Sequence, residues 1–338
     1  MFKRFLFLPI FCLLFLSCEN NNLDVRISDI DVKPLKILRL ENDLFALNTT
    51  NFDKNSNELV KNYGSFYDHY ISSFLNRGGV NDSLYKPTLL SFLNDRDMKE
   101  TYSYVRKLYP DKAIDELNTD LTNCIKRFKY HFPKRKLPTK LITCTTGYNY
   151  AVAYTDSALV LGLDMYLNDT AKFYKMLNIS AYQLRTMNEK YILPNIAKGW
   201  LLTEFDNSKP INTLLYHCIF YGKLFYAVNA LLPNTEDSLL IGYTTKQLTY
   251  CNDNAKNLWG YFAEKNRLYE NNLKTIHELT GEGPFTAAIS KECPPRIAMW
   301  VGWQIVRSYM KKNKDITLEQ LMSEMDSQKI LSKSKYRP

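Results

Sequence analysis

The sequence is poor in the residues and patterns that most catalytic and nucleic-acid-binding motifs require. Only four of its 338 residues are histidines, and no two of them are four positions apart, so no helix can carry two imidazole ligands at that spacing. Its twelve glycines form neither a phosphate-binding loop nor a GxSxG nucleophile elbow. No block of basic residues is long enough to indicate nucleic-acid binding. We therefore expect no metal ion, no cofactor and no nucleic-acid partner.

Long apolar runs are also scarce. The run at the N-terminus, Phe5–Leu16, has about a dozen residues, fewer than the ~20 that a bilayer-spanning helix needs. Two basic residues precede it, and FLSC, Phe15–Cys18, ends it, which is typical of a bacterial lipoprotein signal cut before Cys18. The thiol of Cys18 is the only nucleophile there that can carry a diacylglyceryl thioether. We expect residues 1–17 to be the signal peptide and Cys18 to be acylated, with an ordinary signal peptide as the alternative.

Basic residues outnumber acidic ones. The net charge of +9 falls to +7 once the signal peptide is removed, which suits a soluble surface or attraction to anionic groups. The segment KRFKYHFPKRK, Lys126–Lys136, mixes basic and aromatic residues. Most such runs are solvated helix ends, and the alternative is contact with anionic headgroups or glycans. The partners we expect are the membrane, through Cys18, and other envelope proteins.

The pattern along the chain predicts one α+β domain, mainly helical with a small mid-chain β-sheet. Residues 18–34 read as a tether followed by an edge strand, and residues 35–338 as the domain. Apolar residues recur at helical spacing from about 41 to 132 and again after Leu167. Between them, β-branched and aromatic residues predict strands at about 141–146, 150–154 and 158–163. Pro194 suits the first turn of a helix ending at Phe205, and Thr244-x-x-Gln247 reads as a capping box that opens a helix through Tyr269.

Five cysteines follow Cys18, and their number is odd. No two of them have a CxxC spacing, so at least one thiol is free even in an oxidising compartment, and the disulfide state stays open. We expect most of them to be small buried residues: Cys124, Cys144, Cys218, Cys251 and Cys293.

The stretch RIAMWVGWQIVRSYM, Arg296–Met310, is apolar nearly all round when drawn as a helix. Fifteen residues span ~22 Å, short of the ~30 Å of a bilayer core, so we expect a central core helix. Arg296, Trp300, Trp303 and Arg307 fall on one face of it.

Buried arginines need acidic partners, and Glu282 and Glu292 are the nearest by sequence. The two interpretations are a buried ion-pair network and an anion-binding cleft lined by the arginines. His217 shares a helical face with Tyr221, Leu224 and Val228, so we expect a core histidine rather than a lone ligand.

Several blocks of the sequence together resemble the gliding-motility lipoprotein family GldB of the Bacteroidota. They are the lipobox and the following segments: LGLDMYL (161–167), YGKLFYAVNALLP (221–233), LPNTEDSLLIGYT (232–244), GPFT (283–286), PRIAMWVGWQIVRSYMKKN (295–313) and QKILSKSKYRP (328–338). The resemblance implies an envelope-anchored lipoprotein, associated with the gliding machinery in members that glide. Relatives also occur in bacteria that do not glide, so motility itself does not follow.

The fold of the family looks similar to that of predicted zinc-dependent proteases of the zincin type, in which a helix after a small sheet bears HExxH. Here the corresponding helix, YILPNIAKGWLLTEF at 191–205, has no histidine. We therefore expect a degenerate zincin-like fold in a lipid-anchored envelope protein that acts by interaction. The alternative is an envelope hydrolase with a site near Arg296 and Arg307. The sequence does not distinguish the inner from the outer membrane.

Overall fold

Four short strands form one mixed sheet. The computed structural model describes residues 23–155, 157–205 and 213–338, so the expected signal peptide and Cys18 lie outside the described residues. The strands are β1 (Lys36–Arg39), β2 (Lys140–Cys144), β3 (Val152–Tyr154) and β4 (Ala158–Gly162), in the order β1-β2-β4-β3. β1, β2 and β4 are parallel, and β3 is antiparallel to β4. The three mid-chain strands predicted from the sequence are confirmed, with ends that differ by up to two residues.

The predicted edge strand within residues 18–34 is wrong. The first strand is β1, which begins after Pro34, and the chain before it runs along α6 (Asp111–His131) instead. Arg127 of α6 pairs with Asp24 at 2.9 Å, and Lys129 donates to the carbonyl of Asp31 at 2.9 Å. Side chains of α6 therefore bind polar groups of this segment. Over the residues that the structure describes, the segment does not pair with a strand, although its apolar residues alternate as they would in one.

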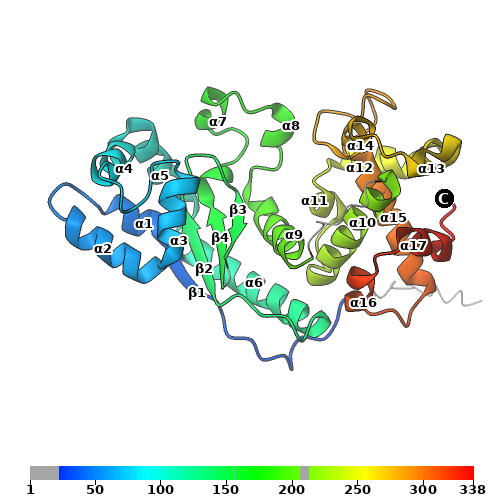
Figure 1. Cartoon of the computed structure of the whole chain (residues 1–338), viewed down its shortest axis with the longest axis horizontal. Coiled ribbons are helices and arrows are strands. Elements are labelled where there is room, and N and C mark those ends of the chain that lie inside the picture. The colour runs from blue at the N-terminus through cyan, green and yellow to red at the C-terminus, as the bar shows by residue number, and fades with distance from the viewer. Residues whose placement is uncertain (1–22, 156, 206–212) are drawn as a thin grey trace, which may run out of the picture.

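The sheet separates two hydrophobic cores. Ile142, Cys144 and Val160 point into a smaller core with the N-terminal helices, and Leu141 and Leu159 point into a larger core with α6 and the later helices. This alternation follows from the two-residue period of a strand. Figure 1 shows the N-terminal helices and α6 on either side of the sheet. The smaller core uses α1 (Leu40–Phe45), α2 (Phe52–Tyr63), α3 (Ser65–His69), the π-helix η1 (Tyr70–Phe74) and α4 (Tyr85–Asn94).

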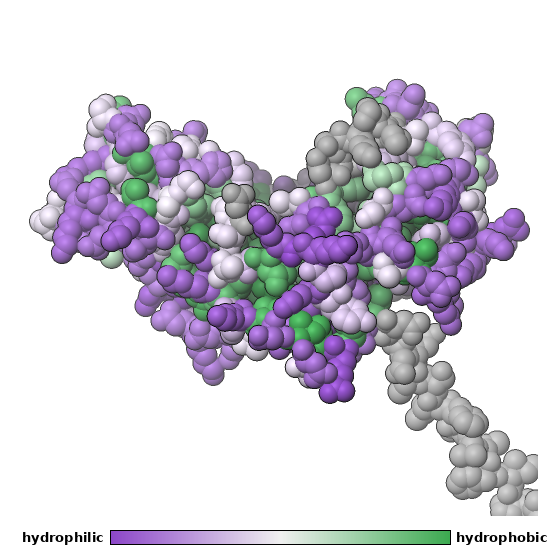
Figure 2. Space-filling model, turned by 60° about the horizontal axis from the view of Figure 1, so that its bottom comes forward, coloured by the Kyte–Doolittle hydropathy of each residue, from purple (hydrophilic) through white to green (hydrophobic). Residues whose placement is uncertain are grey.

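The rest of the chain is helical. Three further helices are α5 (Arg96–Leu108), α7 (Lys172–Met176) and α8 (Ala181–Leu184). Then follow the short helix η3 (Glu189–Tyr191), α9 (Ile192–Glu204), α10 (Leu214–Leu231), α11 (Asp237–Ile241), α12 (Thr245–Asp253), α13 (Ala255–Ala263), η4 (Glu264–Tyr269), α14 (Leu273–Thr280), α15 (Ile297–Lys312), α16 (Leu318–Ser323) and α17 (Ser327–Ser334). Figure 2 shows that the surface is hollowed between the lobe of the N-terminal helices and the lobe of the C-terminal helices.

Local sequence signals place several of these helices. The Thr244 hydroxyl accepts from the N–H of Gln247, and the Gln247 side chain accepts from the N–H of Thr244, which confirms the capping box. The helix that it opens ends at Asp253, however, and α13 and η4 follow as separate elements, so the prediction of one helix through Tyr269 is wrong. Pro194 lies in the first turn of α9, as predicted.

Helices α10 and α15 pack against each other through glycines. A Cβ atom on Gly302 of α15 would lie 1.8 Å from the carbonyl oxygen of Cys218, and one on Gly222 of α10 would lie 2.3 Å from that of Gly302. Neither space can hold a methyl group, because the obstructing atoms are backbone. The two helices therefore approach closely, and α15 is the central core helix that its composition predicted, starting one residue and ending two residues later than expected.

All five cysteines of the described residues are buried and free. This confirms the prediction of small buried residues and resolves the question of pairing in favour of thiols. Among the described residues, no helix combines the length and the apolarity that crossing a bilayer requires.

The glycine contact predicts opposite effects for two Gly→Ala substitutions in helices. Gly302→Ala should lower the free energy of unfolding by about 3 kcal/mol or more, because the new methyl group meets backbone. Gly260→Ala is the matched control: nothing lies within 4 Å of its Cβ position in α13, so the better helix propensity should raise stability by about 0.5–1 kcal/mol. Urea unfolding of the purified chains measures both, and equal effects would contradict the close packing of α10 and α15.

Candidate functional site

A buried carboxylate holds the loop that follows β2. Asp164 lies on the short helix η2 (Leu163–Met165) directly after β4, and its side chain is fully buried. Its Oδ2 atom accepts hydrogen bonds of 2.8 Å from the backbone N–H groups of both Thr146 and Tyr148. The Thr146 hydroxyl donates to Oδ1 at 3.2 Å. Tyr148 has a φ of 65°, a left-handed conformation that is unfavourable for a bulky residue and that these bonds help to stabilise.

Burial is the main influence on the charge of Asp164. It raises the pKa of this carboxyl from 3.8 to about 6, and the hydrogen bonds donated by Thr146 and Tyr148 oppose the rise. The carboxyl therefore changes its charge at a pH about two units higher than an ordinary aspartate does.

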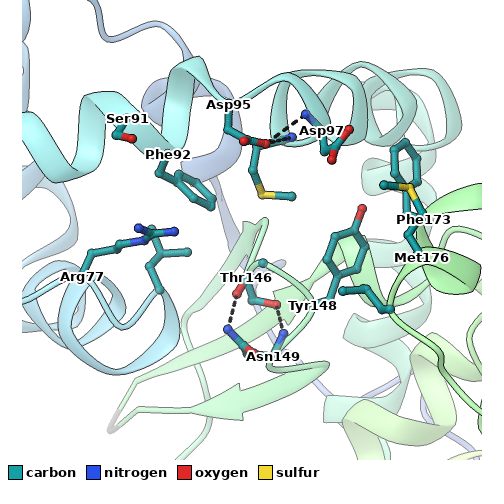
Figure 3. Close-up of a pocket in the computed structure, with 14 residues that line it drawn as sticks. Arg77, Ser91, Phe92, Asp95, Asp97, Thr146, Tyr148, Asn149, Phe173 and Met176 are labelled. Carbon is teal, nitrogen blue, oxygen red and sulfur yellow. Dashed lines mark hydrogen bonds between the residues drawn. The ribbon is translucent and has the colours of Figure 1, made fainter.

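A pocket about 370 Å³ in volume lies beside this loop, at the carboxyl ends of the parallel strands β2 and β4 (Figure 3). Its walls are the junction of α4 and α5, the loop residues Thr146–Asn149 and the segment around α7. In open sheets with parallel strands, ligands bind in the crevice at this edge. This position makes the pocket the candidate functional site.

The lining of the pocket mixes apolar and polar side chains, and three of its residues are charged. Arg77 lies over the ring of Phe92, with 5.8 Å between its guanidinium carbon and the ring centre. Asp95 caps α5, because its Oδ1 accepts from the N–H groups of Asp97 and Met98. The lining residues include no histidine, cysteine or lysine, so a nucleophile–base pair of those types is not present among them. The arrangement suits binding of a ligand with both apolar and charged groups.

The candidate site predicted from the sequence lies elsewhere, at Arg296. This residue has a φ of 58° and precedes α15 rather than lying on it, so the helical geometry that placed it with Trp300 and Arg307 does not apply. Its side chain is buried, and its Nε atom lies 3.3 Å from an oxygen of Glu282. One of its Nη atoms donates to the carbonyl of Gly242, just after α11, at 3.4 Å. Glu282, one of the two acids proposed from the sequence, is thus the acid beside Arg296.

Arg307 has a different partner from the two that the sequence suggested. Its two Nη atoms each lie 2.6 Å from an oxygen of Asp237, the first residue of α11, and its guanidinium lies 3.8 Å from the ring centre of Trp303. Within the described part of the chain, Glu292 is exposed and pairs with neither arginine. The side chain of Arg307 is 30% exposed, so this ion pair is not a buried one as expected. Arg296 and Arg307 thus contact opposite ends of α11.

The aromatic and histidine candidates lie in or beside the larger core. Trp300 and Trp303 are buried, and the ring of Trp303 packs on that of Phe225. Neither indole N–H has an acceptor among the described residues. His217, on α10, is half-buried, its ring lies nearly perpendicular to that of Tyr216, and burial lowers the pKa of His217. A core role of this histidine stays a prediction.

A family model described as gliding motility protein GldB matches residues 20–338. The chain belongs to the GldB family. No curated protein and no solved structure matches it. Membership of the GldB family associates the chain with gliding motility and, through the lipoprotein character of the family, with the cell envelope. The relation of the GldB fold to zincins stays an expectation. Within residues 23–155, 157–205 and 213–338, no three His, Cys, Asp or Glu side chains lie close enough together to hold a metal ion.

Sequence reasoning did not find the pocket or Asp164. LGLDMYL was noted for its likeness to the GldB family, but its aspartate was not singled out. The available signal was an acidic residue directly after an apolar strand, preceded along the chain by the turn at Gly147. Those two features together indicate a carboxylate that holds a turn at a strand end.

Replacing Asp164 should affect stability in a pH-dependent way. The pKa of Asp164 is higher in the folded chain than its ordinary value, so its contribution to stability is largest below pH 4 and is lost as pH rises to about 6. Asp164→Asn keeps the acceptor for both N–H groups and stays neutral. Between pH 4 and pH 7, the free energy of unfolding of Asp164→Asn should therefore rise by roughly 3 kcal/mol relative to that of the parent.

Asp164→Ala is the control, because it removes the acceptor altogether. It should cost roughly 2–5 kcal/mol, because two buried N–H groups lose their partner, and the cost relative to the parent should be largest at pH 4 and smallest at pH 7, where the parent carboxyl is ionised. A parallel pH dependence for the parent and Asp164→Asn would contradict the raised pKa.

Arg307→Ala should lower the free energy of unfolding by about 1–2 kcal/mol. The loss combines a partly exposed bidentate ion pair with the contact on Trp303, and it is smaller than the ~3–5 kcal/mol of a fully buried pair. A double-mutant cycle with Asp237→Ala separates the two contributions in thermal unfolding. Stability equal to that of the parent would show that the pair contributes nothing to folding.

Proposed function

We propose that this GldB-family chain is a lipid-anchored envelope protein that acts by binding a partner and not by catalysis. The chain belongs to a gliding-motility family, and its lipobox ends at Cys18. The observation that carries the proposal is the pocket at the carboxyl ends of β2 and β4. Its lining combines apolar side chains with Arg77, Asp95 and Asp97, a set able to hold a ligand but without a nucleophile–base pair of histidine or cysteine type.

The surface beside the pocket supports this proposal. Met176 and Leu177 line the pocket and are also exposed, so the apolar lining continues onto the outside of the molecule. An apolar surface that leads into a pocket with charges of both signs fits a segment of another envelope protein. We therefore place the partner contact at α7 and the α4–α5 junction.

The packing of α9 bears on the zincin arrangement that the family resemblance implies. Tyr154 of β3 donates its hydroxyl hydrogen to the carbonyl of Ile196, and a Cβ atom on Gly199 would lie 3.0 Å from the Tyr154 ring. In the zincin arrangement implied by the family resemblance, this helix would carry the metal ligands and face the edge of the sheet. Here an aromatic side chain packs between α9 and β3.

The alternative is an envelope hydrolase with a site near Arg296 and Arg307. The geometry favours the binding role, because both arginines contact α11 and they do so at its opposite ends.

We infer the place of the membrane from the position of the N-terminal segment. Cys18 is five residues before Leu23, so the acylated residue lies at most ~18 Å from it. The segment is tied to the end of α6, where Lys134 and Lys136 are exposed. We propose that these lysines face the membrane and contact anionic headgroups, although Arg127 and Arg135 of the same basic run are engaged with Asp24 and Glu204.

One experiment tests both the anchor and the binding surface. Cells that produce the parent chain, Cys18→Ala, Leu177→Glu or Leu273→Glu are labelled with palmitate and treated with a cross-linker. The parent should be processed and labelled and should form a defined cross-linked complex. Cys18→Ala should stay unprocessed and unlabelled. Leu177→Glu should be labelled and lose the complex, because it places a charge on the apolar surface.

Leu273→Glu is the matched control, since Leu273 is an exposed leucine on α14, away from the pocket. It should keep both the label and the complex. Equal labelling of Cys18→Ala and the parent would overturn the anchor, and an unchanged complex in Leu177→Glu would overturn the binding surface.

A further inference from the structure

Helix α9 presents a polar face whose lysine has no partner. Tyr191, the last residue of η3, precedes Asn195 and Lys198 of α9 at spacings of four and three, so the three side chains lie on one face. Asn195 donates to the hydroxyl of Tyr166 at 3.1 Å. Lys198 is half-buried, and its ammonium group makes no hydrogen bond or ion pair with any residue that the structure describes. A lysine in this position lacks the acceptor that a structural lysine has.

Two arginines lie next to this face and share a single acceptor. Arg185, just after α8, donates from Nη2 to the carbonyl of Gly242 at 3.0 Å, and Arg296 donates to the same oxygen at 3.4 Å. The Nε atoms of both arginines are buried and without a hydrogen-bond acceptor. Arg296 is only 6% exposed. Gly242 itself is in the left-handed conformation after α11, where an added Cβ would lie 3.2 Å from Arg296.

The charges of the cluster do not balance. Glu282 is the acid beside it, 3.3 Å from Nε of Arg296, but that contact lacks hydrogen-bond geometry and the Glu282 side chain is 64% exposed. Three cations therefore face one carboxylate, a net charge of +2. Burial, together with the charge of Arg296, lowers the pKa of Lys198 to about 8, and the charge of Glu282 opposes the change. Uncompensated cations of this kind are unfavourable unless an anion joins them.

Four separate segments supply the cluster. Figure 1 shows α8 and α9 near the middle of the molecule, with α11 and α14 to their right on the side of the C-terminal helices. Arg185 and Lys198 come from the middle, and Gly242, Glu282 and Arg296 from the side of the C-terminal helices. The hydrogen bond from Arg185 to Gly242 joins the two sides. A ligand held here would contact both.

We propose that Arg185, Lys198 and Arg296 form a binding site for a dianionic oxyanion of the phosphate-monoester type. A phosphate group carries about −1.5 to −2 charges at pH 7, which matches the net charge of the cluster. It also offers acceptor oxygens in the geometry that guanidinium groups prefer. The site is separate from the pocket beside Asp164 and does not depend on the proposed partner contact there.

Inorganic phosphate is the probe, and the melting temperature of the mature acylated protein in detergent is the measurement. At a phosphate concentration ten times the dissociation constant, the parent should melt about 2 °C higher than in chloride at the same ionic strength. Lys198→Gln should melt at or above the parent without phosphate, because it removes an unpaired cation. Its affinity for phosphate, measured by calorimetry, should fall about tenfold or more.

Lys190→Gln is the matched control, since Lys190 is exposed on η3 and outside the cluster. It should respond to phosphate as the parent does. Short-chain phosphatidic acid tested beside phosphate shows whether the group belongs to a lipid headgroup or a soluble molecule: a larger shift identifies the lipid, and an equal shift identifies the free group.

Two results would overturn the site. One is a parent chain whose melting temperature rises no more in phosphate than in chloride. The other is a Lys198→Gln variant that melts lower than the parent without phosphate and keeps the full phosphate response, which would show that Lys198 serves folding alone.

Discussion

The close packing of α10 and α15 is the constraint on which the larger core depends. Because Gly222 and Gly302 bring backbone against backbone, α15 lies in the middle of the core and buries Trp300 and Trp303. Its position also sets where its two ends emerge. Arg296 precedes the helix and Arg307 lies near its end, and α11 is held between them through Gly242 and Asp237. A wider separation of α10 and α15 would shift both contacts at once.

The sheet has a second organising role, because it divides the chain into two cores that meet at its edge. The alternating side chains of β2 and β4 serve both cores, and the loop after β2 emerges where the two meet. Asp164 fixes that loop by accepting from Thr146 and Tyr148. The walls of the pocket thus come from helices in different parts of the chain. Its base is the loop after β2, which the buried carboxylate of Asp164 holds in place.

Features that depend on nearby residues could be predicted from the sequence. Runs of β-branched residues identified β2, β3 and β4, and the Thr244–Gln247 spacing identified a helix start, because both signals act within a few residues. The backbone conformation of Arg296 could not be predicted in this way. Its left-handed backbone depends on the loop before α15, and the periodicity of the helix contains no information about that loop.

The partner of Arg307 and the residues around Lys198 were beyond prediction for a related reason. Asp237 is seventy positions from Arg307, and the cluster at Lys198 draws on four segments. Such contacts follow from how helices dock, which one sequence does not specify. The candidate site beside Asp164 was likewise visible only once the strand ends and α4–α5 had been brought together.

The five buried thiols have a consequence for how the protein ages in an oxidising compartment. Without a disulfide among the described residues, no covalent cross-link limits how far this part of the chain can open. Burial raises the pKa of Cys124 and Cys293 to about 12, so the reactive thiolate is nearly absent while the fold is closed. In an oxidising compartment, each opening that wets a thiol exposes it to mispairing or sulfenic acid formation. The lifetime of the folded protein then depends on how often its cores open. A change that weakens the α10–α15 contact would increase the rate of thiol oxidation before it caused measurable unfolding.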